Sequence, residues 1–196
     1  MLRELRLTLA AAGLFAAGLL PGLAPALAQE GLPDLPGPNL VIEIAGTANG
    51  TVVIDLLPDT APRHVEQITT LARQGAYDGV VFHRVIEGFM AQTGDVKFGK
   101  TGGDTRMAGM GGSDLPNIPA EFSNISFQRG IVGMARSNDP NSANSQFFIM
   151  FADGAFLDGQ YTVVGRVISG LDVVDRIQRG EPPATPDVMV KVTVTE

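Results

Sequence analysis

The sequence predicts a mainly β fold, a closed eight-stranded antiparallel β-barrel capped by two α-helices. Short runs rich in Val, Ile, Thr and aromatic residues recur along the chain between turn residues, which is typical of strands. Only two stretches have apolar residues at helical spacing. With 44% apolar residues in a chain of 196, the protein has enough apolar side chains for the core of one domain.

Seven runs along the chain are the predicted strands. They cover residues 40–44, 51–57, 80–86, 130–135, 146–151, 161–168 and 188–195. Between the first two, Asn49-Gly50 predicts a hairpin with a two-residue primed turn, because both residues tolerate positive φ. In the third, strand alternation places Phe82 and Arg84 on one face and His83 on the other.

Two helices are predicted, over residues 60–74 and 171–179. The first is expected to bury a face made by Val65, Ile68, Leu71 and Ala72. Thr60 is its expected N-cap and Gly75 ends it, while Gly180 is expected to end the second helix. The two helices are expected to cover the open ends of the barrel.

Residues 1–28 have the pattern of a cleaved export signal. Two Arg precede an apolar run over residues 7–20, and Ala26-Leu27-Ala28 matches the small-x-small site that signal peptidase cuts. The run is shorter than the roughly 20 apolar residues that span a membrane. We therefore expect a signal peptide over 1–28, a Pro- and Gly-rich linker over 29–39 and one domain over 40–196. No stable membrane association is expected after cleavage.

The composition excludes several classes of chemistry. A chain without Cys has no disulfides, thiolate metal sites or Cys nucleophile, and two His leave little room for a His-rich metal site. The formal charge is −7 and the basic residues are scattered, which argues against a nucleic-acid partner. We expect no metal and no other cofactor.

A phosphate-loop pattern occurs at residues 94–101, but we reject a nucleotide site there. Such a loop must open a helix whose N-terminal amides hold the phosphates. The following residues 102–112 contain five Gly, each of which costs about 1 kcal/mol in a helix relative to Ala. We interpret the segment as a Gly-rich surface loop. A nucleotide hydrolase is the third hypothesis for the function of the protein, after the two described below. The Met-rich part of this loop, residues 107–110, is read as loop rather than as a contact surface.

Three ordered blocks of sequence point to a family. Residues 82–95 read F-H-R-V-I-E-G-F-M-A-Q-T-G-D, residues 130–150 read GIVGMARSNDPNSANSQFFIM, and Phe156-Leu157-Asp158-Gly159 precedes a strand. Together they resemble the cyclophilin family of peptidyl-prolyl cis-trans isomerases over roughly residues 40–196. The resemblance implies isomerisation of X–Pro bonds in proline-containing polypeptides during the folding of exported proteins. The resemblance and the signal both look bacterial, so we expect the protein in the periplasm. We also expect a monomer.

The resemblance also implies which residues form the site. Arg84 and Gln92 are the expected catalytic residues. The expected substrate-binding residues are Phe89, Met90, Ala135, Arg136, Gln146, Phe148, Phe156, Leu157 and Tyr161. Many members of the family have Trp, His and Asn where this chain has Phe156, Tyr161 and Arg136. Phe lacks the N–H donor of Trp, which argues against tight binding of the drug cyclosporin.

These residue types suit a reaction in which no bond is broken. Rotation about an X–Pro bond has a barrier of about 18–20 kcal/mol because of amide resonance. Twisting the amide localises a lone pair on the proline nitrogen, to which a guanidinium such as that of Arg84 can donate. The second hypothesis is a non-catalytic proline-peptide binding module or holdase chaperone on the same fold.

The remaining candidates are given structural roles. His83 is expected to be a structural histidine and His64 to lie on the solvated face of the first helix. Phe147, which alternates with Phe148, is expected to point into the core.

Overall fold

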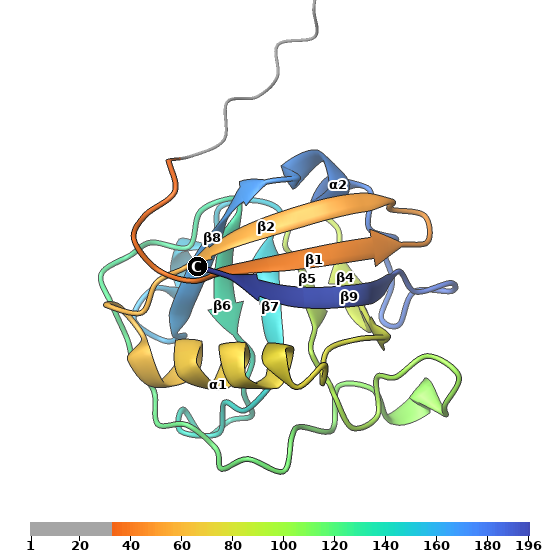
Figure 1. The fold of residues 1–196 in the computed structure, drawn as a ribbon, viewed down its shortest axis with the longest axis horizontal. Helices are drawn as coiled ribbons and strands as arrows, with labels where there is room; N and C mark the ends of the chain where they lie inside the picture. The colour runs from red at the N-terminus through yellow and green to blue at the C-terminus, as the bar shows by residue number, and fades with distance from the viewer. Residues whose placement is uncertain (1–32) are drawn as a thin grey trace, which may run out of the picture. The chain divides into compact units, whose positions relative to one another are not determined.

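Within residues 33–196, which are those that the computed structural model describes, nine strands form one antiparallel sheet (Figure 1). The predicted signal peptide over 1–28 lies outside the described residues. The strands are β1 (Asn39–Ala45), β2 (Gly50–Leu56), β3 (Val80–Val81), β4 (Arg84–Ile86), β5 (Met90–Thr93), β6 (Ile131–Met134), β7 (Phe147–Met150), β8 (Val163–Ser169) and β9 (Val188–Thr195). Their order in the sheet is β3-β9-β1-β2-β8-β6-β7-β5-β4.

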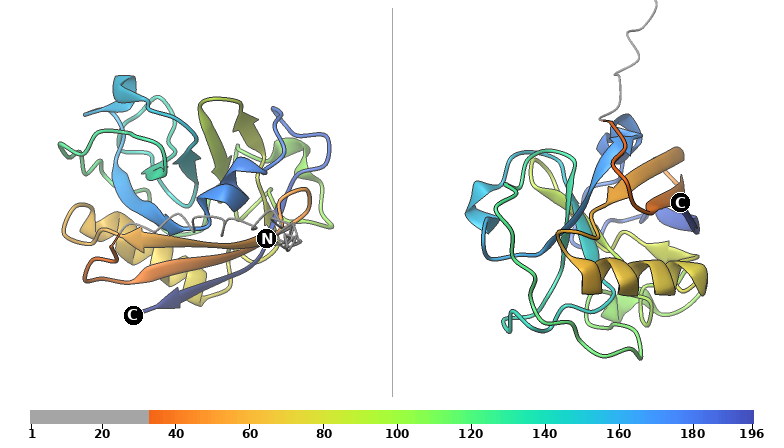
Figure 2. Two further views of the ribbon diagram at one scale, coloured as in Figure 1. Left: turned by 90° about the horizontal axis from the view of Figure 1, so that it is seen from above. Right: turned by 60° about the vertical axis from the view of Figure 1, so that its left-hand side comes forward.

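The sheet is curled, and its two ends meet at consecutive residues of the chain. The end strands β3 and β4 are separated only by Phe82 and His83. The Phe82 N–H donates to the Asp187 carbonyl at 2.9 Å beside β9, while the His83 N–H donates to the Gln92 carbonyl at 3.2 Å on β5. Neighbouring residues thus bond to opposite ends of the sheet. The wall made by β9, β1 and β2 faces the wall made by β6, β7 and β5 (Figure 2).

The prediction of a closed eight-stranded barrel is corrected by this topology. Residues 80–86 form two short strands rather than one, and β3 and β4 do not pair with each other, so the sheet is an open half-barrel. The break occurs because Phe82 turns into the core, where it is fully buried, instead of sharing a face with Arg84 as predicted. Strand β5 was not predicted, because its four residues include Gln92 and Thr93 and lie between glycines.

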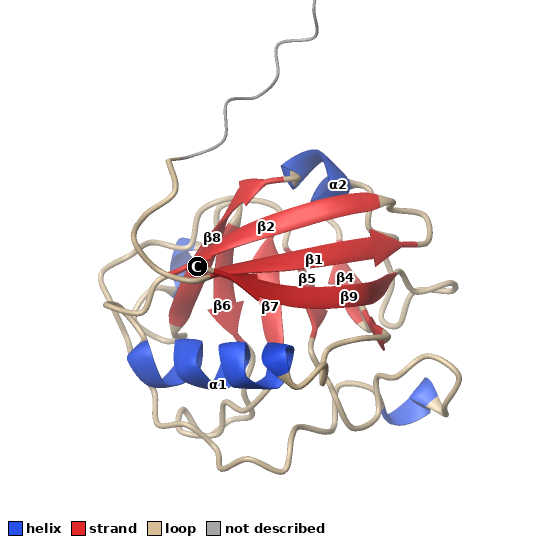
Figure 3. Cartoon of the chain, viewed as in Figure 1, coloured by secondary structure: helices blue, strands red, loops and turns tan. Residues whose placement is uncertain are grey.

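Two helices lie at opposite ends of the curled sheet (Figure 3). They are α1 (Pro62–Arg73) and α2 (Leu171–Asp175), and the single turns η1 (Thr105–Met107) and η2 (Ala155–Leu157) are 3₁₀-helical. The apolar face predicted for the first helix is buried, as are Val173 and Val174 of the second. The predicted cap is wrong: Ala61 is the N-cap of α1, without a side-chain hydrogen bond.

Helix α2 ends at Asp175, earlier than predicted. Gly180 does not cap it, because its backbone N–H and C=O both pair with Val85 of β4. The hairpin predicted at Asn49-Gly50 is confirmed, since β1 and β2 pair there. The predicted two-residue primed turn is wrong, because four residues lie between β1 and β2 and Asn49 does not have a positive φ. The buried Asp187 carboxylate holds this loop by accepting from the Ala48 N–H at 2.8 Å.

The sheet has a buried cluster on each face. The larger cluster, inside the curl, includes Phe147 and Ile149 of β7. The smaller one includes Phe148 and Met150 of the same strand, together with Met90. Phe147 therefore points into the main core as predicted, and the second cluster lies beneath the candidate site. Across residues 33–196, no helix is long and apolar enough to span a bilayer.

Candidate functional site

A row of four residues crosses the sheet and forms the base of the site. Arg84 of β4 is opposite Gln92 of β5, Gln92 is opposite Phe148 of β7, and Phe148 is opposite Gly133 of β6. Partners in register point to the same face of a sheet. The pairing therefore brings the predicted Arg, Gln and Phe into one line, although they are far apart in sequence.

The tight turn between β4 and β5 adds an aromatic ring to this row. The Phe89 N–H donates to the Ile86 carbonyl at 3.0 Å, and Gly88 has φ of 68°, a conformation that favours glycine. The Phe89 carbonyl in turn accepts from the Phe151 N–H at 2.8 Å, which ties the turn to the end of β7. Phe89 is thereby fixed beside Arg84.

A cavity of about 400 Å³ lies over the row. It is lined by Arg84, Phe89, Met90, Gln92, Ala135, Arg136, Phe148, Phe156, Leu157, Gln160 and Tyr161. The Phe148 ring packs on Phe127 and meets the edge of Tyr161, with ring centroids 5.8 and 5.9 Å apart. Phe156 rests on Phe89 at 5.5 Å and is 65% exposed. The lining combines apolar side chains with the two cations Arg84 and Arg136, which suits a compact ring attached to a peptide backbone.

Glycine is required beneath the Phe148 ring. A Cβ at Gly133 would lie 2.5 Å from a ring carbon of Phe148 and 2.6 Å from one of Phe127. No side chain fits in that space. Gly133 therefore allows both rings to sink against β6, which sets the depth of the cavity.

The turn η2 is anchored from outside the cavity. The Asp158 carboxylate, which follows Leu157, accepts from the Ser126 hydroxyl at 2.6 Å and from the Phe127 N–H at 2.8 Å. The hydrogen bond from Ser126 has the largest effect in lowering the pKa of Asp158, and the one from the Phe127 N–H lowers it further. Leu157 and the stacked Phe127 are thereby held together.

The Arg84 guanidinium belongs to a directed chain of hydrogen bonds. Its Nη1 donates to Gln92 Oε1 at 3.4 Å, and Gln92 Nε2 donates to Gln146 Oε1 at 3.0 Å. Gln146 Nε2 then donates to the carbonyls of Gly109 and Gly111, at 3.0 and 2.7 Å. Each amide has one orientation that satisfies this chain, so Gln92 presents its oxygen to Arg84.

The other side of Arg84 is held by Glu181. Glu181 Oε2 accepts from Arg84 Nε at 2.9 Å, in an ion pair whose side chains are 43% and 52% exposed. The segment is brought there by the reciprocal bonds between Gly180 and Val85, both 2.8 Å. No partner for Arg84 Nη2 is found within residues 33–196, so this nitrogen is available to a ligand.

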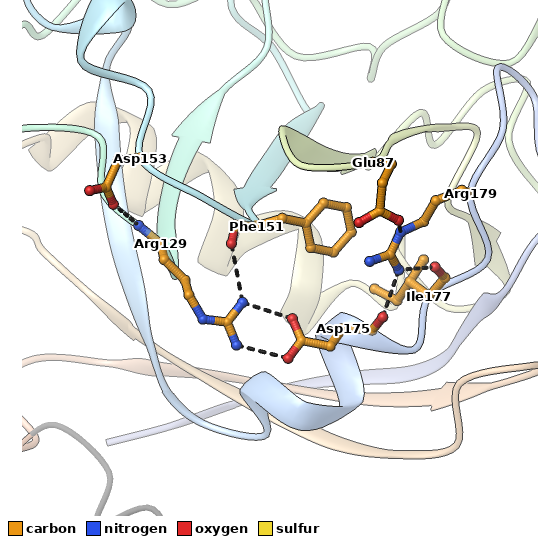
Figure 4. Close-up of polar contacts among 7 residues, drawn as sticks. All are labelled: Glu87, Arg129, Phe151, Asp153, Asp175, Ile177 and Arg179. Carbon is orange, nitrogen blue, oxygen red and sulfur yellow. Dashed lines mark hydrogen bonds and ion pairs between the residues drawn. The ribbon is translucent and has the colours of Figure 1, made fainter.

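A cluster next to Gly180 fixes the same segment (Figure 4). Arg179 donates to the carboxylate of Glu87, just after β4, and to the carbonyls of Asp175 and Ile177, at and just after the end of α2. Its guanidinium lies 4.2 Å from the centroid of the Phe151 ring. Arg129 forms a two-pronged ion pair with Asp175, at 2.7 and 2.8 Å. The cluster joins the β4–β5 turn, the end of β7 and α2, and so fixes the backbone that presents Glu181.

A second cavity, of about 580 Å³, adjoins the first. Gln92, Ala135 and Arg136 line both, and the second is completed by Gly109, Met110, Gly111, Gly112, Ser113, Asn117, Ser137, Ser142, Asn144 and Gln146. The Gly-rich loop forms its wall because the buried Asp95 carboxylate accepts from the N–H groups of Gly109 and Gly111, both at 2.8 Å.

The phosphate-loop match has no matching structure. The residues after it form only the single turn η1, and no α-helix starts there. Lys100 donates instead to the Asp78 carbonyl at 2.6 Å. Burial lowers the pKa of this Lys against the opposing influence of the Asp78 carboxylate. The segment is a loop, as expected.

Both histidines are buried, which corrects the prediction of a solvated His64. Its Nδ1 lies 2.6 Å from Glu121 Oε2, and its Nε2 has no hydrogen-bond partner in the described chain. Neither ring nitrogen of His83 has such a partner there. Burial lowers the pKa of both, against the opposing Glu121 at His64 and Asp95 at His83. The neutral form is therefore favoured for both residues.

The structure brings all the predicted site residues except Gln146 to the first cavity, and Gln146 lies in the second, bonded to Gln92. Their roles stay predictions. The sequence analysis missed Glu181, Asp95 and Gln160. No local signal marks Glu181, which is 97 residues from Arg84, whereas Gln160 and Asp95 lie within or next to the quoted motifs.

Comparison with known proteins gives a consistent result. Residues 40–196 match the family described as "Cyclophilin type peptidyl-prolyl cis-trans isomerase/CLD". A probable peptidyl-prolyl cis-trans isomerase of Brucella suis is 60% identical over 153 residues, covering 74% of this chain and 78% of that protein. The isomerase ppi1 of Schizosaccharomyces pombe is 40% identical over 137 residues, covering 67% of this chain and 81% of that protein.

Solved structures are similar in fold. The cyclophilin AquaCyp293 from Hirschia baltica superimposes with a TM-score of 0.68 at 31% identity, covering 79% of this chain and 73% of that one. A cyclophilin-type isomerase of Cryptosporidium parvum, crystallised in the presence of the dipeptide Ala-Pro, gives 0.69 at 23% identity and covers 81% and 99% of the two chains.

Proposed function

Because the chain belongs to the cyclophilin-type peptidyl-prolyl cis-trans isomerases, we propose that its first cavity receives the proline of exported polypeptides and that Arg84 stabilises the twisted amide. The observation that carries the proposal is the position of the Arg84 guanidinium. It lies at the side of an apolar cavity, held through Nε and Nη1, with Nη2 available. Gln92 acts with it by fixing the orientation of Nη1.

The role of Arg84 follows from the electronic change during rotation. In the planar amide the nitrogen lone pair is delocalised, and in the twisted amide it is a hydrogen-bond acceptor. A guanidinium, which stays charged at every physiological pH, donates to that lone pair only in the twisted state. This is selective binding of the transition state. Neither a nucleophile nor a proton transfer is needed.

The apolar floor supplies the other contribution. Phe89, Met90 and Phe148 would enclose the proline ring and remove the amide from water. Desolvation disfavours the more polar planar form relative to the twisted one. A rate increase from about 10⁻² to about 10³ per second requires about 7 kcal/mol. One hydrogen bond from a charged donor contributes about 1.5–3 kcal/mol, so the cavity must provide the remainder.

An Arg84→Ala variant tests the mechanism. We expect kcat/KM for a short proline peptide to fall by about 10² to 10³, as for removal of one preorganised transition-state donor. Arg73→Ala, which removes an exposed Arg at the end of α1, is the matched control. Exchange spectroscopy by NMR on a bound proline peptide measures the cis–trans rate directly. Full activity in the Arg84→Ala variant would refute the mechanism.

We place the protein in the bacterial periplasm, as a monomer that acts on exported polypeptides during their folding. The proposed location rests on the pattern of residues 1–28, with its apolar run and small-x-small site. The expected mature chain begins at Gln29. Mass spectrometry of protein recovered from the periplasm of a bacterial host tests this location. A full-length chain in the cytoplasm would contradict it.

A further inference from the structure

Most arginines in the described part of this acidic protein are paired with carboxylates. Within residues 33–196, seven of nine arginines form ion pairs. The exceptions are Arg63, at the start of α1, and Arg136. An unpaired Arg on an open surface is ordinary, but Arg136 lines both cavities of the site.

The Arg136 guanidinium is held in one orientation without a counter-charge. Its Nε and Nη2 donate to the Gln160 carbonyl at 3.3 and 2.9 Å, and its Nη1 donates to the Ser137 carbonyl at 2.9 Å. It lies 4.3 Å from the centroid of the Tyr161 ring. Each terminal nitrogen keeps a second N–H for which the described residues offer no partner. Because these contacts already order the guanidinium, a ligand does not have to immobilise it.

The surroundings do not cancel this charge. The only charged side chains that line the two cavities in the described chain are Arg84 and Arg136, and Arg84 is paired with Glu181. The rest of the second cavity is lined by glycine, amide, hydroxyl and apolar groups. A peptide whose proline occupies the first cavity passes Arg136 where the two cavities join. The local potential there favours an anion.

We propose that Arg136 is a specificity determinant that selects substrates with an acidic side chain within two residues of the proline. The proposal rests on the proposed function, because it takes the first cavity as the proline site. The carboxylate would accept the free N–H groups of the guanidinium fork. An exposed ion pair of this kind changes affinity by a factor of about two to five, and more where the bound peptide excludes water.

A matched set of peptides tests the selection. Each peptide has one proline among alanines, with Glu, Gln or Lys placed in turn at each of the two positions on either side. NMR titration gives Kd, and exchange spectroscopy on the same samples gives the cis–trans rate. At one or more positions we expect Glu to bind about threefold more tightly than Gln and about tenfold more tightly than Lys. The preference should shrink as salt is added.

Variants of the two unpaired arginines identify the source of the preference. Arg136→Gln should bring the Kd ratio of Glu to Gln peptides to about one, and Arg136→Lys should retain a preference for Glu. Arg63→Gln removes the same charge away from the site and should leave the ratio unchanged. Equal Kd values for Glu and Gln peptides at all four positions, or a preference that survives Arg136→Gln, would overturn the proposal. Binding without faster exchange would contradict the proposed function instead, and absence of binding would contradict both.

Discussion

Glu181 holds the guanidinium of Arg84, the proposed catalytic residue, and its removal provides a prediction at the scale of single residues. The carboxylate accepts from Arg84 Nε at 2.9 Å and so directs the opposite edge of the guanidinium away from it. Without it, Arg84 has only the long bond to Gln92. We expect Glu181→Ala to lower kcat about three- to tenfold with little change in KM, because small misplacements of a catalytic group are costly. Steady-state kinetics with a proline peptide measures kcat and KM separately.

Glu181→Gln and a matched control separate orientation from stability. Gln keeps an oxygen that can accept from Nε, so about half of the activity should remain. Glu43→Gln, at an exposed position of β1, should have no effect. Since both partners of the Arg84–Glu181 pair are about half exposed, the free energy of unfolding should change by less than about 1 kcal/mol. A loss of stability that matched the loss of activity would contradict a positioning role.

The candidate site shows what a local sequence motif can and cannot predict. Phe89, Met90 and Gln92 follow Arg84 closely, and a hairpin with a tight turn necessarily brings them together. Phe148 joins them through the register of β7 with β5; the alternation along β7 indicated only that Phe148 faces away from Phe147. Glu181 could not be predicted, because it reaches Arg84 only through the pairing of Gly180 with Val85. Local patterns do not encode that long-range contact.

The Gly-rich loop is an ordered element because one buried carboxylate organises it. Asp95 accepts four backbone N–H groups, from Lys97, Phe98, Gly109 and Gly111, at 2.8 to 3.0 Å. The loop therefore closes onto its own beginning, and the Gly109 and Gly111 carbonyls are held against Gln146. Sequence analysis described the loop by its composition and did not detect this anchor.

Asp95→Asn is predicted to loosen the whole loop. The amide group of Asn is a donor, and it would face backbone donors where the carboxylate had accepted, leaving buried N–H groups unsatisfied. We expect the free energy of unfolding to fall by about 2–4 kcal/mol, as measured by urea denaturation, with lower activity because Gln146 loses its acceptors. Asp104→Asn, at an exposed carboxylate of the same loop, should leave the melting temperature unchanged. Equal stability of Asp95→Asn and the wild type would refute this role.

Six of the nine strands of the described sheet were predicted nearly as they occur, whereas β3, β4 and β5 were not. The segments that became β1, β2, β6, β7, β8 and β9 agree with the structure to within about two residues, because β-branched and aromatic residues dominate them. Strands β3, β4 and β5 have two to four residues each and are defined by which sheet end they bond to. That choice depends on tertiary contacts such as the burial of Phe82, which a propensity does not contain.

At the scale of the whole molecule, the two histidines dominate the pH dependence of stability near neutrality. The chain has no Cys, and the shifted carboxyl groups of Asp78, Asp104, Asp158 and Asp172 have pKa values lowered below 3.8, outside the neutral range. Burial of His64 and His83 lowers both of their pKa values below the usual 6.5. The charge of Arg84 also lowers the pKa of His83. The opposing carboxylates raise the pKa of their neighbours, Asp95 that of His83 and Glu121 that of His64.

The sign follows from which state binds more protons. Above pH 7 both states hold neutral histidines, so the stabilising contribution is complete. As the pH falls through 6.5, the unfolded chain takes up protons before the folded one, and the free energy of unfolding decreases until the folded-state pKa values are passed. The slope is at most about 1.4 kcal/mol per pH unit for each histidine.

Urea denaturation between pH 5.0 and 7.5, on the order of one measurement per half unit, tests this prediction. The wild type should lose stability towards acid, and His64→Gln or His83→Gln should each reduce the slope by removing one titrating group. The double variant should be nearly independent of pH across the window, whatever its absolute stability. Neither ring nitrogen of His83 has a partner in the described chain, and His64 has one only at Nδ1, where Glu121 Oε2 lies 2.6 Å away. A wild type that gained stability towards acid would show that Glu121 and Asp95 outweigh the cost of burial.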